Sequence, residues 1–362
     1  MNGPKKAVLA LSDGSAYFGK GLGAECTKEG ELVFNTGMTG YMEALTDPSY
    51  AGQILLMTYP MIGNYGISKE WGESAKVHVE GFCVRRDYGT PHHVQSRLNL
   101  DGYLQDNGVG CITDVDTRAI TRKVRDCGVM PAALCVYSQE EPDVQELVAK
   151  AKKLDYSKMD FVEKVSGKEV VKYKATRGGR KRHVVLLDCG VKMSIVRELG
   201  ARGIDVTSVN AFSSADDVLS FSPDGIVASN GPGDPALLGK ICDELGKLLD
   251  YPMMGICLGH QLLGQVAGAK TYKLKFGHRG GNHPVMEMES GKVAITTQNH
   301  GFAVDEKGLG REWEMTHANL NDRTCEGLRH KSLPIFSIQY HPEAHPGPRD
   351  STDLFDKFVK TL

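Results

Sequence analysis

One cysteine has neighbours that could make it a nucleophile. Cys257 lies in Gly-Ile-Cys-Leu-Gly (255–259), between an apolar segment and a segment of helical character. A glycine on each side is typical of a nucleophile elbow, a tight strand-to-helix turn that raises the side chain above the edge of a sheet. The N-terminus of the following helix would favour a thiolate and offer amides to an oxyanion. The pattern alone also suits a buried structural cysteine.

A thiolate nucleophile needs a base, and His341-Pro342-Glu343 is the candidate. It directly follows the apolar segment 335–339, so the end of a strand could bring it to the same sheet edge as Cys257. Residues i and i+2 of an extended chain face the same side, which would let the Glu343 carboxylate orient the His341 ring.

The same segment could also hold a metal ion, because His345 continues the alternation of His341 and Glu343. The prolines at 342 and 346 disfavour a regular strand, and no second ligand cluster stands out. We therefore expect no metal at this site.

A third feature is the sequence Ser-Asn-Gly-Pro-Gly-Asp-Pro at 229–235, which follows an apolar segment. Two glycines and two prolines over these seven residues predict a rigid loop with exposed amides at the carboxyl edge of the sheet, where ligands bind in open α/β folds. Such a loop can supply a second oxyanion donor. It could also be a phosphate loop, but the Gly-Lys-Ser/Thr ending is missing.

These three features, in this order, resemble the class I (triad) glutamine amidotransferases, with 255–261 as nucleophile motif and His341-Pro342-Glu343 as distal pair. Further segments resemble the small subunit of carbamoyl-phosphate synthetases: 230–235, 277–284 and 298–302, and in the N-terminal half 35–41, 46–50, 59–60 and 62–66. The resemblance therefore spans nearly the whole chain.

The resemblance implies a catalytic triad of Cys257, His341 and Glu343, with the amides of Leu258 and Gly231 as oxyanion hole. It also implies that L-glutamine is bound by Ser49, Gly231, Gly233, Leu258, Gln261, Asn299, Gly301 and Phe302. Other interpretations stay open: Gln261 could be an ordinary helix residue, 299–301 a turn, and Ser49 a cap. We expect His300 to be a core histidine rather than a catalytic helper.

The resemblance further implies that ammonia passes to a large subunit, which makes carbamoyl phosphate for arginine or pyrimidine synthesis. No cofactor is expected on this chain, whereas ATP, Mg and bicarbonate are expected on the large subunit. A heterodimer, or a higher oligomer of heterodimers, would result. A free-standing hydrolase of the same fold, such as a γ-glutamyl peptidase, and a regulatory subunit without catalysis are the alternatives.

These residues must be positioned by two kinds of domain. In the C-terminal half, strands expected at 183–187, 204–209, 225–228 and 252–256 alternate with helices at 194–202, 241–249 and 259–267, and further strands at 292–297, 325–329 and 335–338 precede a closing helix at 354–362. This alternation predicts an α/β fold with a mostly parallel sheet and flanking helices. The N-terminal half, with strands expected at 7–11, 32–35, 54–58 and 78–84 and a helix at 115–124, predicts an α+β or β-rich domain.

A basic run without apolar periodicity, 172–182, predicts a linker between domains at 1–171 and 183–362. We expect the N-terminal domain to dock on the partner. Charges are balanced, with 43 Lys+Arg against 45 Asp+Glu, so neither nucleic acid nor a membrane is an expected partner. Without an apolar N-terminal run, the protein is expected to be cytoplasmic. Its nine scattered cysteines include no Cys-x-x-Cys pair and predict neither disulfides nor a zinc knuckle.

Overall fold

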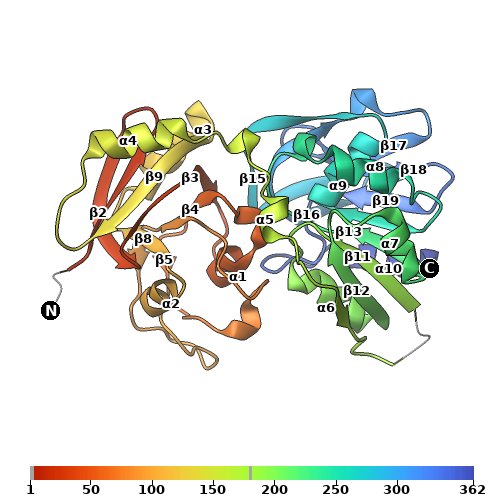
Figure 1. Cartoon of the computed structure of the whole chain (residues 1–362), viewed down its shortest axis with the longest axis horizontal. Helices are drawn as coiled ribbons and strands as arrows, with labels where there is room; N and C mark the ends of the chain where they lie inside the picture. Colours follow the sequence, from red (N-terminus) through yellow and green to blue (C-terminus); the bar gives the residue numbers. More distant parts are fainter. Residues whose placement is uncertain (1–3, 179–181) are drawn as a thin grey trace. The chain divides into compact units, whose positions relative to one another are not determined.

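The structure is a computed structural model that describes residues 4–178 and 182–362. The chain divides into two compact units, Met1–Met159 and Asp160–Leu362, and most of their elements are labelled in Figure 1. The boundary thus comes before the basic run 172–182, of which residues 179–181 lie outside the described residues. It comes earlier because the preceding segment packs within the second unit, where Ser166 Oγ accepts a hydrogen bond from the amide of Ala211 at 3.0 Å.

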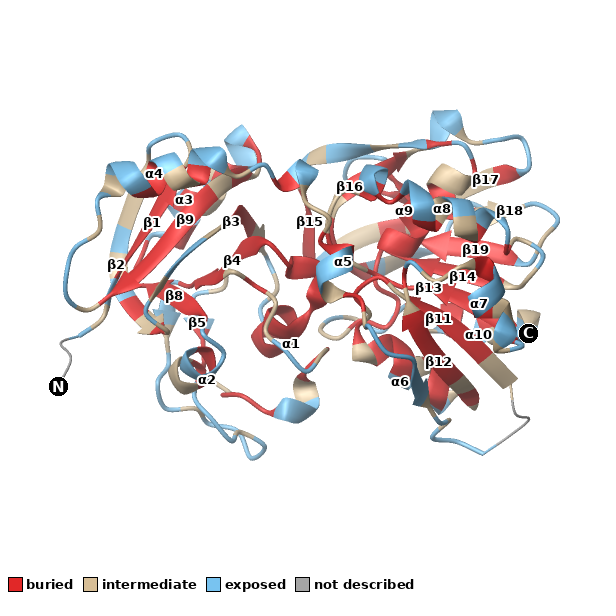
Figure 2. Cartoon of the chain, in the orientation of Figure 1, coloured by how far each residue is buried: buried red, intermediate tan, exposed pale blue. Residues whose placement is uncertain are grey.

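The first unit contains a closed barrel with the strand order β1–β2–β8–β6–β4–β3–β9. Its strands are β1 (Lys6–Leu11), β2 (Ala16–Gly23), β3 (Cys26–Asn35), β4 (Gln53–Met57), β6 (Gly81–Cys83), β8 (Gly110–Thr113) and β9 (Met130–Tyr137). The pairs β3–β4, β4–β6 and β6–β8 are parallel, whereas β9 pairs antiparallel with both β1 and β3. Apolar runs such as β1 and β4 are buried along almost their whole length, as Figure 2 shows.

Helices and short strands complete this unit: α1 (Tyr41–Thr46), α2 (Leu100–Asp106), α3 (Thr117–Cys127), α4 (Val144–Lys153), and the pair β5 (Met61–Ile62) and β7 (Arg86–Asp87). Leu147, Val148 and Ala151 of α4 pack against β1 and β9. The β-rich domain that the sequence predicts is present, although β2, β8 and β9 are not among the strands expected from it.

The second unit is built on a ten-stranded sheet in the order β10–β12–β11–β13–β14–β19–β18–β16–β15–β17. Its strands are β10 (Val171–Tyr173), β11 (Arg182–Asp188), β12 (Ile204–Asn210), β13 (Gly225–Ala228), β14 (Met253–Ile256), β15 (Lys270–Glu287), β16 (Val293–Asp305), β17 (Trp313–Asn319), β18 (Cys325–His330) and β19 (Ile335–Ile338). Strands β12, β11, β13, β14 and β19 pair in parallel.

The other strands of this sheet pair antiparallel, so the sheet is mixed rather than mostly parallel. The difference arises from β15 and β16, a long antiparallel pair of strands with two register shifts. From the sequence, no strand is expected at β15, which contains three glycines and a proline.

Helices cover both faces of the parallel part, because apolar side chains of a buried strand point alternately to each face. Val185 and Leu187 of β11 belong to the core shared with α7 (Ala215–Ser220), α8 (Gly239–Gly246) and α9 (Leu258–Val266). Val184 and Leu186 belong to the opposite core, shared with α6 (Met193–Ala201) and α10 (Asp353–Thr361). A short helix, α5 (Val162–Val165), precedes β10. Among the described residues, no helix has the length and apolar character to cross a membrane.

Candidate active site

Cys257 stands at a strained turn between β14 and α9. Its backbone has a φ of 53°, in the left-handed region that non-glycine residues rarely adopt. The turn is held because the Cys257 amide donates to the carbonyl oxygen of Ile338 at 2.8 Å. A Cβ on Gly259 would lie 2.1 Å from the carbonyl oxygen of Ala228, so only glycine allows this approach of helix and strand. The elbow predicted from the sequence is present.

His341 and Glu343 are in direct contact: Nδ1 of His341 lies 2.6 Å from Oε1 of Glu343. Both are buried. The contact is not made by an extended strand as predicted. The chain turns after β19, and the amide of Ala344 donates to the carbonyl oxygen of His341 at 3.0 Å. Residues 344 and 345, which follow, have left-handed backbone conformations.

Sequence reasoning missed a buried lysine in this group. Nζ of Lys192 lies 3.0 Å from Oε1 of Glu343 and donates to the carbonyl oxygen of Ala344 at 2.8 Å. Lys192 is buried at the start of α6, and its own amide donates to Oδ1 of Asn230 at 3.0 Å. Its position just beyond the end of β11, at the carboxyl edge of the parallel strands, is the signal that could have identified it.

The charges of this group determine its protonation. Burial would lower the pKa of His341, but attraction to the Glu343 carboxylate outweighs it and raises that pKa above its ordinary value; Cys257 adds to this effect. Burial would likewise raise the pKa of Glu343, yet Lys192 and His341 hold it well below the usual range. A protonated imidazole beside an ionised carboxylate is therefore the favoured state at neutral pH.

The imidazolium has one nitrogen available for chemistry. Within the described part of the chain, Nε2 of His341 has no hydrogen-bond partner. Sγ of Cys257 donates to the carbonyl oxygen of Asn299 at 3.7 Å. Cys257 nevertheless raises the pKa of His341, so the thiol and the imidazole are close enough to interact.

The loop 229–235 packs directly on the elbow. The amide of Gly259 donates to the carbonyl oxygen of Ser229 at 3.0 Å. A Cβ on Gly231 would lie 2.7 Å from Cδ2 of Leu258, so this loop and the first residue of α9 are in contact. Gly233 adopts a φ of 93°, which a glycine readily takes. The two amides expected to form an oxyanion hole therefore belong to adjacent segments.

The strand β16 forms another side of the site. Asn299 contacts the thiol through its carbonyl oxygen, and Gly301 and Phe302 follow on the same strand. Nε2 of Gln261, on α9, donates two hydrogen bonds. One goes to the backbone carbonyl oxygen of Phe302 at 2.9 Å, and the other goes to the side-chain oxygen Oε1 of Gln339 at 3.1 Å. Residues 299–301 are thus strand rather than turn, and Gln261 is tied to that strand.

Ser49 belongs to the first unit, in a single helical turn, Pro48–Tyr50. Its amide donates to Oδ1 of Asp47 at 2.9 Å, which is the capping arrangement that Asp-Pro-Ser predicts. Its expected contact with glutamine stays a prediction.

Comparison with known proteins agrees with this geometry. Residues 185–361 match the family Glutamine amidotransferase class-I, and residues 9–134 match the family Carbamoyl-phosphate synthase small chain, CPSase domain. The chain is 49% identical to the carbamoyl phosphate synthase small chain of Archaeoglobus fulgidus, over 99% of both chains. It is 48% identical to that of Methanocaldococcus jannaschii, over 98% of both. The chain belongs to the carbamoyl-phosphate synthase small-chain family, with a class I glutamine amidotransferase domain as its second unit.

Proposed function

We propose that this subunit hydrolyses L-glutamine with a triad of Cys257, His341 and Glu343 and delivers the ammonia to a large synthase subunit. One observation carries the proposal: three chemical groups follow neighbouring strands at one edge of the sheet. Cys257 stands on a strained elbow, and the buried imidazole of His341 lies 2.6 Å from the carboxylate of Glu343. This is the nucleophile, base and orienting group of acyl transfer.

In the first step, the Cys257 thiolate attacks the side-chain amide carbon of glutamine. The oxygen of the tetrahedral intermediate accepts hydrogen bonds from the amides of Gly231 and Leu258. The imidazolium of His341 gives its Nε2 proton to the leaving nitrogen, the C–N bond breaks, and ammonia and a γ-glutamyl thioester are formed. Gln261, Asn299, Gly301 and Phe302, with Gly233 and Ser49, bind the rest of the substrate.

In the second step, neutral His341 removes a proton from water, and the oxygen attacks the thioester carbon. The C–S bond breaks, glutamate leaves, and the thiolate–imidazolium pair is restored. Glu343 stays ionised in both steps because the Lys192 ammonium group lies 3.0 Å from its carboxylate and lowers its pKa, also while His341 is neutral. It holds the ring orientation that both proton transfers need.

The products require a partner. Ammonia released into water would be protonated and lost as a nucleophile, so a protected route to a large subunit serves the chemistry. That subunit would bind ATP, Mg and bicarbonate and make carbamoyl phosphate for arginine or pyrimidine synthesis. The match to relatives named as small chains over almost their full length supports this assignment.

The substitution Cys257→Ser tests the proposal in the complex with the large subunit. We expect glutamine-dependent carbamoyl phosphate synthesis to fall by about a thousandfold or more, while synthesis from added ammonia continues. Cys127→Ser, at an exposed cysteine of the first unit, is the matched control and should change neither rate. Full glutaminase activity in Cys257→Ser would remove this cysteine from the mechanism.

A further inference from the structure

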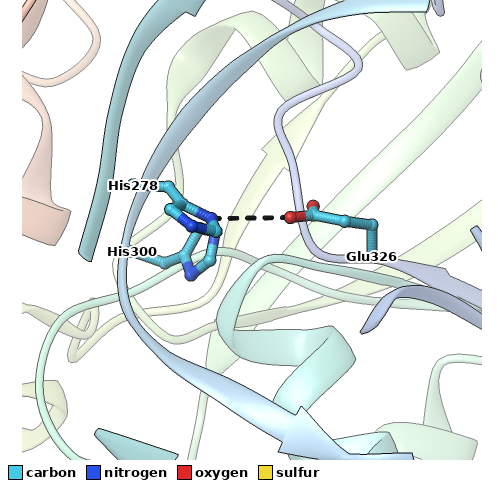
Figure 3. Close-up of side chains that lie close together, drawn as sticks. All are labelled: His278, His300 and Glu326. Atoms are coloured by element: carbon cyan, nitrogen blue, oxygen red, sulfur yellow. Dashed lines mark ion pairs between the residues drawn. The ribbon is translucent and has the colours of Figure 1, made fainter. Parts of the chain in front are cut away.

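Three buried side chains, one each on β15, β16 and β18, lie close together: His278, His300 and Glu326 (Figure 3). Their ligand-type atoms are within 4.8 Å of one another, and Nδ1 of His278 lies 3.5 Å from Oε1 of Glu326. Two imidazoles and a carboxylate are a frequent metal-ligand set. None of the three is part of the triad.

The partners of these side chains describe a hydrogen-bonded network instead. Nδ1 of His300 lies 2.8 Å from the carbonyl oxygen of Phe302, and Nε2 lies 2.9 Å from Oε1 of Gln298. Both ring nitrogens therefore face oxygen atoms. Nε2 of His278 lies 2.8 Å from Oδ2 of Asp322, so His278 sits between two carboxylates as their counter-ion. A metal ion would have to displace these contacts.

Glu326 is the centre of this network. It is completely buried. Its Oε2 accepts a hydrogen bond from Nε2 of Gln298 at 2.9 Å, and its Oε1 accepts one from Nδ2 of Asn319 at 3.1 Å. Because both carboxylate oxygens accept, the amide of Gln298 can point in only one direction, with its oxygen towards His300.

From Gln298 the network continues to the proposed glutamine site. His300 contacts the carbonyl oxygen of Phe302, and the same oxygen accepts from Nε2 of Gln261 at 2.9 Å. Gln261 lies one turn after Cys257 on α9, and its backbone N–H donates a hydrogen bond to the backbone carbonyl oxygen of Cys257 at 3.1 Å. An unbroken set of polar contacts thus links Glu326 to the helix that carries the nucleophile.

We infer that Glu326 is a positioning residue for glutamine binding, acting through Gln298 and His300 on the Phe302 carbonyl and Gln261. Glu326 touches neither substrate nor thiol. Its carboxylate fixes the direction of the Gln298 amide, and the oxygen of that amide lies against Nε2 of the His300 ring. Nδ1 of the same ring lies beside the Phe302 carbonyl oxygen, through which Gln261 joins α9 to β16. Buried networks of this kind set geometry because a polar group that loses its partner in the interior is costly.

The inference rests on the proposed function, since it assigns Gln261 and Phe302 to the glutamine pocket. The test is the kinetics of the complete complex with Glu326→Met, which keeps the side-chain length and removes both acceptors, and Glu326→Gln, which keeps one acceptor. Glu314→Met, on the neighbouring strand β17, is the matched control.

We expect Glu326→Met to raise the KM for glutamine by about 10- to 100-fold, with a much smaller fall in kcat. The KM of Glu326→Gln should lie between those of Glu326→Met and the parent protein, and the KM of Glu314→Met should equal that of the parent. Synthesis from added ammonia should stay unchanged in all three. If Glu326→Met does not fold, Glu326→Gln decides the matter, and its KM must rise at least about threefold.

An unchanged KM in Glu326→Gln and Glu326→Met, in a complex that hydrolyses glutamine normally, would overturn the inference and leave the proposed function intact. A parent complex without Cys257-dependent glutaminase would instead refute the proposed function. Metal analysis supplies a second check: one equivalent of zinc in the parent chain, absent from Glu326→Met, would show a metal site in place of the network.

Discussion

At the scale of single residues, the main departure from expectation concerns Glu343, because its carboxylate contacts Lys192 as well as His341. The sequence predicted its contact with His341 from strand alternation, and the contact exists, but a turn makes it. The place of Lys192 beyond an apolar segment could have marked it as a residue of the sheet edge, but its contact with Glu343 could not be derived, because 151 residues separate the two and no motif contains both. Proximity of this kind depends on the sheet order and strand direction, which place the ends of β11 and β19 at the same edge.

We predict that Lys192→Met lowers glutaminase turnover by up to about a hundredfold, because Glu343 then has one cation fewer to hold its position. Lys192 lowers the pKa of Glu343, so its removal raises that pKa. The carboxylate is consequently protonated at a higher pH, and the acid limb of the pH–rate profile should move to higher pH. Lys247→Met, at an exposed lysine directly after α8, is the control. An acid limb that stays in place would contradict this account.

At the scale of elements, the strands and helices around the nucleophile follow closely from the sequence. Segments β11, β13, β14, α9 and β19 are short apolar runs between clear turn residues, and their predicted bounds differ by few residues from those observed. Strands β15 and β17 were not predicted, since β15 contains three glycines and a proline and alternates poorly. Its pairing with β16 over most of its length outweighs those local preferences.

The packing of the elbow gives a prediction at this scale. Gly259→Ala should destabilise the second unit by about 3 kcal/mol and abolish glutaminase activity, because its Cβ would overlap the Ala228 carbonyl group. Gly239→Ala, where a Cβ would meet no atom within 4 Å, should change stability by less than about 1 kcal/mol. Chemical denaturation of the two variants measures the difference. Equal stabilities would show that helix α9 can move away from β13 without cost.

At the scale of the whole molecule, catalysis and the barrel belong to separate units. The proposed triad, the loop 229–235 and the β16 residues all belong to the second unit, and the first contributes Ser49 alone to the predicted site. The two family matches divide the chain in the same way. Because the whole proposed triad belongs to the second unit, we predict that the barrel serves as the surface that docks on the large subunit.

We therefore expect the isolated chain to hydrolyse glutamine slowly and the large subunit to accelerate it by about 5- to 150-fold, the range of ordinary coupling between sites. A variant that lacks residues 1–159 should lose this acceleration and the affinity for the large subunit. Glutaminase turnover and binding, with and without the large subunit, measure both effects. Undiminished binding and activation in a folded truncated variant would disprove the docking role.

The pairing of the strands also bears on how the protein avoids self-association. Every strand of the first unit's barrel has a neighbour on each side, so the barrel presents no free edge on which another chain could add a strand. The sheet of the second unit does have an edge at β10, where the exposed Val170 and Val171 are followed by Lys172. A lysine on an exposed edge strand is one of the ways in which proteins keep a second copy from pairing there. We expect Lys172, the first residue of the basic run predicted to be a linker, to act against such pairing.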